Sequence, residues 1–361
     1  MKILFVSDFY YPHIGGVTEH IYHLANEFED MGHKVSILTS NMEGDLRPDE
    51  RRVVRLGKSI VVHMNRSNSR MTGWINLSRL SRVVNDYDII HIHGVIAPTL
   101  PLVVLKVSSK TNIFTFHPTF ESSTLYTIFK RPLKHFFEKI DGKIAVSVTA
   151  RDSIEKYFPG DYRIIPNGID TDRFRVCTDK NPFEILFVGR IERRKGLQFL
   201  IYALPLIKRE IPEAYLTVAG GGYKGMNLDI PTEVKDSINF LGFVAPEDLP
   251  EIFSRASVFV SPAISGESFG IVLLEAMATE TPVIASSIPG YRCVVEDEKN
   301  GLLVSPENPK EIADKVITLL KDNNIRKILI RGGLKTARKY EWGVVAKDIM
   351  DFYYEVNPSL P

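Results

Sequence analysis

Two glutamates bracket a glycine-containing turn in the run Gly-Glu-Ser-Phe-Gly-Ile-Val-Leu-Leu-Glu at residues 266–275. Gly270 lets the backbone approach a ligand closely where we predict a helix to begin. The unpaired N–H groups and the dipole of a helix start attract anions. Glu267 would lie at the mouth of this anion site, and Glu275 about two helical turns deeper. A phosphate held between two carboxylates indicates a ligand with hydroxyls at both ends, such as a nucleotide-diphosphate sugar. A surface helix with two solvated acids is the alternative.

Two cations follow another predicted strand, residues 184–189. Arg190 comes at the end of that strand, and Lys195 comes at the start of the next helix. An arginine can bind a diphosphate in bidentate fashion, and a lysine adds a point charge. We therefore interpret this pair as diphosphate-binding, rather than as part of a basic surface loop. The neighbours Arg193 and Arg194 are expected to be solvated.

Alternating strands and helices must position these groups. Residues 2–7, 17–31 and 34–39 read as strand, helix and strand, a Rossmann-like opening with Gly15-Gly16 at the helix start. No G-x-G-x-x-G occurs there, so a dinucleotide site is not expected in this half. The G-x-G-x-x-G at residues 220–225 opens no helix, and we interpret it as a loop beside the phosphates. Further strands are predicted at 60–64, 89–93, 113–116 and 144–147.

Histidines occur at the ends of two of these strands. His91-Ile-His93 places two imidazoles on one side of a strand, which is half of a metal site. Partner ligands at a suitable spacing are missing, so no metal is expected. His117 comes just past a buried strand, where a parallel sheet presents its binding edge. A hydrogen-bonded structural histidine is the alternative reading for His117.

The chain is 361 residues long and 44% hydrophobic, enough for two domains with separate cores. No apolar run is long enough to span a membrane, and the first residues read as a strand rather than a signal peptide. Cys177 and Cys293 form no disulfide framework, which favours a cytoplasmic location. Residues 1–168 carry 21 Lys and Arg against 17 Asp and Glu, and the net charge of the whole chain is +1. This charge is too small for a nucleic-acid partner.

The run Ile-Pro-Asn-Gly-Ile-Asp-Thr-Asp-Arg-Phe at residues 165–174 ends the first domain, and a polar linker extends to Pro182. We expect an acceptor-binding domain at 1–168, with about 342–361 added, and a donor-binding domain at 169–341. Asp170 and Asp172 spell a D-x-D motif, which we interpret as turn chemistry.

These motifs together resemble the retaining glycosyltransferases of family four, and the resemblance covers nearly the whole chain. It implies an α/β GT-B fold, in which two Rossmann-like domains face across a cleft and a C-terminal helix crosses back to the N-terminal domain. It also implies transfer of a hexose from a UDP- or GDP-linked sugar without an obligatory metal or other cofactor.

The resemblance implies roles for individual residues. Glu267 would bind the sugar hydroxyls, Glu275 the ribose, and His117 the region of the reacting sugar. Arg190 and Lys195 would hold the diphosphate. The catalytic set is His117, Arg190, Lys195 and Glu267, and further donor-binding positions are Gly15, Gly16, Gly189, Gly221, Val244, Ser268, Phe269, Gly270 and Ile271.

The opening of the chain is similar to enzymes that glycosylate phosphatidylinositol, so a lipid-linked acceptor is one expectation and a soluble sugar or polysaccharide is the other. Acceptor contacts are expected from Tyr10, His13, Arg66 and Arg70, the last two in a Ser/Asn-rich loop. Residues 125–143 mix aromatic and basic side chains. They could rest on an anionic, cytoplasmic membrane face or form a packed helix pair.

Two rival functions share these motifs, namely a nucleotide-sugar epimerase on the same fold and a catalytically idle sugar-nucleotide-binding module. One position departs from the family pattern, because Glu280 stands where most relatives carry glycine. A left-handed backbone there would cost about 1–2 kcal/mol, unless the turn differs.

Overall fold

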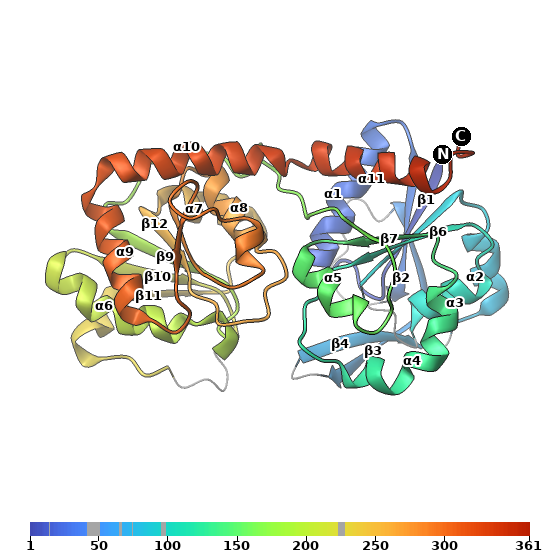
Figure 1. Ribbon diagram of the computed structural model, residues 1–361, viewed down its shortest axis with the longest axis horizontal. Coiled ribbons are helices and arrows are strands. Elements are labelled where there is room, and N and C mark those ends of the chain that lie inside the picture. The colour runs from blue at the N-terminus through green and yellow to red at the C-terminus, as the bar shows by residue number, and fades with distance from the viewer. Residues whose placement is uncertain (14, 42–50, 65–66, 74, 95–98, 223–227) are drawn as a thin grey trace. The chain divides into compact units, whose positions relative to one another are not determined.

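The structure is a computed structural model that describes residues 1–13, 15–41, 51–64, 67–73, 75–94, 99–222 and 228–361. It divides into two compact units (Figure 1). Unit 1 contains Met1–Asn167 and Trp342–Pro361, and unit 2 contains Gly168–Glu341.

Unit 1 is built on a sheet with the strand order β4-β3-β2-β1-β5-β6-β7-β8, in which only the β3–β4 pair is antiparallel. Its strands are β1 Lys2–Val6, β2 Lys34–Asn41, β3 Val53–Met64, β4 Ser67–Gly73, β5 Ile89–His93, β6 Thr111–Phe116, β7 Gly142–Ala145 and β8 Tyr162–Ile164. Its helices are α1 Gly16–Asp30, α2 Leu77–Val84, α3 Leu100–Val107, α4 Thr124–Phe137, α5 Val148–Glu155 and α11 Trp342–Val356.

Helix α1 shows why this unit includes the end of the chain. Its apolar side chains recur at helical spacing and are fully buried, among them Ile21, Leu24 and Phe28. The same hydrophobic cluster contains Val345 and Ile349 of α11. Helix α11 therefore belongs to the core of unit 1, although it follows unit 2 in the sequence.

Unit 2 has a wholly parallel sheet with the order β11-β10-β9-β12-β13-β14. Its strands are β9 Glu184–Val188, β10 Tyr215–Ala219, β11 Ile238–Gly242, β12 Val258–Ser261, β13 Val283–Ser286 and β14 Leu302–Val304. Its α-helices are α6 Leu197–Glu210, α7 Leu249–Arg255, α8 Ile271–Ala278, α9 Pro309–Lys321 and α10 Asn323–Lys339. Short 3-10 turns are η2 Arg193–Lys195, η3 Thr232–Ser237, η4 Pro246–Asp248 and η5 Tyr291–Cys293.

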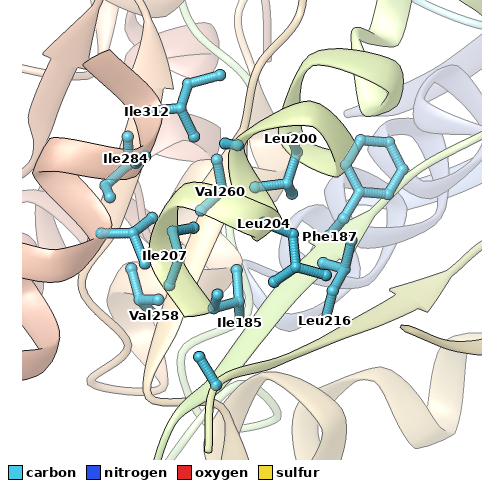
Figure 2. Packing of buried hydrophobic residues seen from close by; sticks show 14 of the residues in the cluster. Ile185, Phe187, Leu200, Leu204, Ile207, Leu216, Val258, Val260, Ile284 and Ile312 are labelled. Carbon is cyan, nitrogen blue, oxygen red and sulfur yellow. The ribbon is translucent and has the colours of Figure 1, made fainter. Parts of the chain in front are cut away.

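Aliphatic side chains from both strands and helices fill the core of unit 2 (Figure 2). Ile185 and Val258 come from adjacent strands, and Leu204 and Ile207 come from the helix that covers them. Because parallel strands are covered on both faces, residues 185–188 of β9 are all apolar. This core fixes the strand ends, after which the charged residues follow.

Two expectations about unit 1 need correction. The segment expected to be a Ser/Asn-rich loop contains strand β4, which pairs with β3 in a hairpin. The basic and aromatic segment 125–143 contains one helix, α4, which ends at Phe137, and the first residues of β7, rather than a helix pair. Within the described residues, no helix combines the length and the apolar character needed to cross a bilayer.

Candidate functional site

The carboxyl ends of the unit 2 strands gather the charged residues. Strand β9 ends at Val188, and Gly189 and Arg190 follow it directly. The Arg190 guanidinium is exposed and pairs with Glu192 at 2.9 Å. Lys195 lies in η2, just before α6, and its side chain is only 16% exposed. The structure therefore places both cations in the loop where a parallel sheet binds ligands.

Glu267 meets two cations in this loop. The Lys195 Nζ atom lies 2.8 Å from Glu267 Oε1, and the Arg194 guanidinium lies 2.6 Å from the same oxygen. Arg194 also donates to the Gly266 carbonyl and pairs with Glu192. The expectation that Arg194 is solvated was therefore wrong, because its side chain bridges two acids. Arg193 is exposed, as expected.

The turn before α8 brings backbone N–H groups to the same loop. Gly270 caps the helix in a left-handed conformation, with φ of 97°. A Cβ atom there would meet the Tyr291 ring at 2.8 Å, so only glycine fits. The helix begins at Ile271, so Glu275 lies about one turn into it and Glu267 precedes it. The expected separation of two helical turns was too large.

The remaining donor positions of unit 2 surround this turn. Ser268 and Ile271 are half-buried, and Phe269 is buried against Tyr340. Val244 is half-buried beside the apolar core. Gly221 accepts a hydrogen bond from the Ile191 N–H, which ties its loop to the one that carries the cations. Residues 223–225 of the glycine loop lie outside the described residues.

The turn before α1 in unit 1 holds the other glycine pair. Gly15 caps α1 and Gly16 is its first residue, exposed at the helix N-terminus. His13 is exposed and contacts the Phe9 ring. Tyr10 is fully buried in the core, so the expectation that it contacts an acceptor was wrong. Arg66 lies outside the described residues, as does the side chain of Arg70, although Arg70 itself is in β4 rather than in a loop.

His117 directly follows β6 and belongs to a buried group of histidines. Its Nε2 atom lies 3.3 Å from Nδ1 of His93, the last residue of β5. The His20 ring of α1 packs against His117 at 4.7 Å between centroids. Burial lowers the pKa of His117 to about 3 and those of His20 and His93 well below 6.5.

Sequence spacing missed this group because its members come from three separate elements. His20, His93 and His117 each offer a nitrogen, and these three atoms lie within 4.8 Å of one another. The fourth histidine, His91, points to different partners. It bonds Tyr353 at 2.5 Å and Thr115 at 2.7 Å. His91 therefore joins α11 to the sheet.

Asp170 and Asp172 belong to a local turn. The Asp170 carboxylate accepts a hydrogen bond from the Arg173 N–H, and the Asp170 carbonyl accepts one from the Phe174 N–H. This is a turn closed by its own side chain, which confirms the prediction of turn chemistry at this motif. The D-x-D motif thus has a structural explanation.

In the loop cluster of unit 2, Arg194 and Lys195 contact Glu267, which precedes the N-terminus of α8, and Arg190 pairs with Glu192 of the same loop. Cations and free N–H groups bind phosphate oxygens, and carboxylates accept hydrogen bonds from sugar hydroxyls. The cluster thus has the chemistry to bind an anion that carries a polyol.

Two family models match the chain. The model described as "Glycosyl transferases group 1" matches residues 168–336, and the one described as "Glycosyltransferase Family 4" matches residues 14–173.

Curated relatives align over the full length. A phosphatidyl-myo-inositol mannosyltransferase of Mycolicibacterium smegmatis is 32% identical, and the alignment covers 99% of this chain and 94% of that protein. An uncharacterized glycosyltransferase of Methanocaldococcus jannaschii is 28% identical over 98% of both chains.

Solved structures share the architecture at lower identity. Anabaena HepE in complex with UDP has a TM-score of 0.79 and 18% identity, with 98% of this chain and all of that chain covered. The pneumococcal O-GlcNAc transferase GtfA in complex with UDP and GlcNAc has a TM-score of 0.74 and 14% identity, with 99% of both chains covered. The chain therefore has the α/β fold of GT-B type, with two Rossmann-like domains.

Proposed function

The chain belongs to family 4 of the glycosyltransferases, and from that premise we propose that it transfers mannose from a nucleotide-diphosphate sugar to an inositol phospholipid. The class of reaction, retaining hexosyl transfer to a hydroxyl, follows from the family. The identity of the sugar and of the acceptor rests on the full-length relative, whose name states both.

The observation that carries the donor assignment is the contact of Lys195 and Arg194 with Glu267. In unit 2, two cations lie next to one acid. This arrangement matches a sugar diphosphate, in which phosphate groups lie next to sugar hydroxyls. We assign the diphosphate to Arg190, Lys195 and the α8 N-terminus. In the donor complex, Lys195 exchanges its bond with Glu267 for one with a phosphate oxygen, and Glu267 accepts from sugar hydroxyls.

These groups act on the leaving group. Negative charge develops on the diphosphate as its bond to the anomeric carbon breaks. Cations and N–H groups that are already in place stabilise this charge without reorganisation. Loss of one such donor typically costs about 10²–10³ in rate. The acceptor hydroxyl attacks from the face that the diphosphate leaves, and a phosphate oxygen takes up its proton.

The lipid acceptor finds support on helix α4 of unit 1. Ile128 is 67% exposed and Phe129 is 43% exposed, and both stand beside the exposed cations Lys130, Arg131 and Lys134. We call these five residues the α4 surface. Apolar and basic side chains in one exposed helical segment suit the interface of an anionic membrane. We assign the α4 surface to peripheral membrane contact.

Transfer assays test this proposal. The protein is incubated with GDP-mannose, UDP-glucose or UDP-N-acetylglucosamine and with phosphatidylinositol vesicles, free myo-inositol or no acceptor. Mass spectrometry should find one added hexose on phosphatidylinositol only with GDP-mannose. Arg190→Ala should reduce turnover by about 10²-fold or more, whereas the exposed neighbour Arg193→Ala should not.

Three outcomes would contradict the proposal. Transfer only to a soluble sugar would overturn the lipid acceptor, and transfer only from a UDP-sugar would overturn mannose. Conversion of the donor into an isomer without any acceptor would reveal an epimerase.

A further inference from the structure

Two of the three clustered histidines of unit 1, His20 and His93, have incomplete hydrogen bonding. Within the described residues, both ring nitrogens of His20 and the Nε2 atom of His93 are buried without a hydrogen-bond partner. The contact between His93 Nδ1 and His117 Nε2, at 3.3 Å, is the hydrogen bond that joins the cluster. The direction of this hydrogen bond, from His93 to His117 or the reverse, decides which nitrogen of His117 carries a proton.

All three rings are neutral near pH 7, because burial lowers their pKa values well below 6.5. A neutral imidazole has one N–H and one lone pair, so it donates from one nitrogen and accepts at the other. The bond between His93 and His117 must therefore be N–H···N, with a single proton between the two rings.

The unpartnered Nε2 of His93 indicates the direction of this bond. If His117 donated, His93 would carry its proton on Nε2, which is buried and meets no acceptor among the described residues. A buried N–H without a partner is rarer in proteins than a buried acceptor without one. The arrangement with fewer unmet donors has the proton of His93 on Nδ1, from which it donates to His117 Nε2.

We propose that His93 is a positioning residue that holds His117 in its Nδ1–H tautomer. This rests on the proposed function, in which His117 meets the reacting sugar. The Nδ1–H of His117 is then fixed as a hydrogen-bond donor, and His117 can stabilise an oxygen atom but cannot serve as a base at that nitrogen.

Asn167 lies near the same cluster. Its side chain raises the pKa values of both His117 and His20, although burial lowers both values overall. The Asn167 Oδ1 atom is buried and has no hydrogen-bond partner within the described residues of the structure. The direction of the bond between His93 and His117 therefore rests on the ring nitrogens of the histidines themselves.

The same three histidines are of a type that binds metal ions, but their arrangement fits a metal ion less well than it fits a hydrogen-bonded cluster. Zinc holds imidazole nitrogens at about 2.0–2.1 Å, which brings ligand atoms to roughly 3.3 Å of one another. The three nitrogens here are gathered only within 4.8 Å. The His20 ring also packs edge to face on His117, at 83°, as aromatic neighbours do.

The test is NMR of the donor-free protein, labelled with ¹⁵N at histidine. Long-range ¹⁵N–¹H spectra distinguish protonated from unprotonated ring nitrogens, and single-histidine variants assign the signals. The wild type should show His117 protonated at Nδ1 and unprotonated at Nε2. In His93→Leu, the signals of His117 should move toward a mixture of tautomers. His93→Asn, whose amide N–H replaces the Nδ1 donor, should restore the wild-type pattern.

His91→Leu is the matched control, since His91 is equally buried on the same strand but bonds Tyr353 and Thr115 instead. It should leave the His117 tautomer unchanged. In transfer assays, His93→Leu should lower kcat by about tenfold with little change in the donor KM, since the lost orientation matters in the transition state. His93→Asn should recover most of that loss.

A wild-type His117 protonated at Nε2 would overturn the proposal, as would an unchanged tautomer in His93→Leu. Stoichiometric zinc in the purified protein, with all three rings shifted on its removal, would replace it with a metal site. If the tautomer depends on His93 but His117→Ala retains full turnover, the hydrogen-bond assignment stands and the role of His117 in the reaction is wrong.

Discussion

At the scale of single residues, Glu267 is the best-determined member of the candidate site. Two cations contact the same carboxylate oxygen, and the glutamate side chain is only 13% exposed. The sequence indicated Lys195 and Glu267 through their motifs. It could not indicate Arg194, because a third arginine in a basic run carries no signal of where its side chain points.

Replacing Arg194 with glutamine tests this contact. The variant keeps a hydrogen-bonding side chain but loses the bond that orients Glu267, so kcat/KM for the donor should fall by about tenfold. Steady-state kinetics with Arg193→Gln as the matched control measures the effect. Equal kinetics for the two variants would mean that Arg194 does not position Glu267.

Asp8, just after β1, predicts a dependence of stability on pH. Burial raises the pKa of its carboxyl to about 6, despite hydrogen bonds from Thr72 and the Leu100 N–H. The folded state thus favours the protonated form. The stability from this group is complete below its unfolded pKa of 3.8 and is lost as the pH rises through 6.

Asp8→Asn keeps the acceptor oxygen and removes the charge. It should raise the free energy of unfolding by about 2–3 kcal/mol at pH 7.5, and this gain should shrink by roughly 1 kcal/mol at pH 5. Urea denaturation at both pH values measures it. A gain that is independent of pH would show that Asp8 does not titrate in this range.

Glu280, which stands where most relatives carry glycine, keeps the left-handed backbone of that turn. Its φ is 55°, so the strain of a non-glycine residue is tolerated there. The Glu280 N–H bonds the Met277 carbonyl and the Thr281 N–H bonds the Ala276 carbonyl, which together form a Schellman cap for α8. Glycine favours this position.

Glu280→Gly should therefore stabilise the protein by about 0.5–1 kcal/mol, after the greater chain entropy of glycine is subtracted from the relieved strain. Thermal or urea unfolding measures the change. Glu280→Ala serves as the control, because it removes the carboxylate but keeps the Cβ atom. A gain in the alanine variant as large as in the glycine variant would trace the effect to charge instead of backbone conformation.

At the scale of elements, periodicity located most helices and strands, including α11 at residues 342–356. It failed at β4, whose polar sequence Ser-Asn-Ser-Arg-Met-Thr-Gly lacks the alternation of a half-buried strand. Pairing with β3 gives that segment its strand conformation. The sequence did not predict the histidine cluster for a related reason, because only the folded sheet brings residues of α1, β5 and the end of β6 together.

The α4 surface gives a prediction at this scale. The double variant Ile128→Ser with Phe129→Ser should bind vesicles that contain phosphatidylinositol at least tenfold more weakly, because it removes two exposed apolar side chains. Vesicle sedimentation at low and high salt measures the apolar and ionic parts. Ile328→Ser, at an exposed isoleucine of α10, is the control. Equal binding by both variants would remove α4 from membrane contact.

At the scale of the whole molecule, the sequence motifs predicted the fold class, and the family models and structural relatives confirm it. Its two sheets, one wholly and one largely parallel, could be inferred because the buried strands are rich in apolar residues. The sugar and the acceptor could not be inferred equally well. Recognition of a sugar or an acceptor depends on individual loop side chains, which no periodic pattern constrains.

The central claim is that unit 2 holds a nucleotide-diphosphate sugar through Arg190, Lys195 and Glu267, and that the sugar is transferred with retention. NMR of the anomeric proton and carbon of the product tests it most directly, with the wild type and Lys195→Ala compared on the same donor. An α-linked donor should yield an α-linked product, and the variant should form it about 10²-fold more slowly or worse. A β-linked product, or undiminished turnover in Lys195→Ala, would contradict the account.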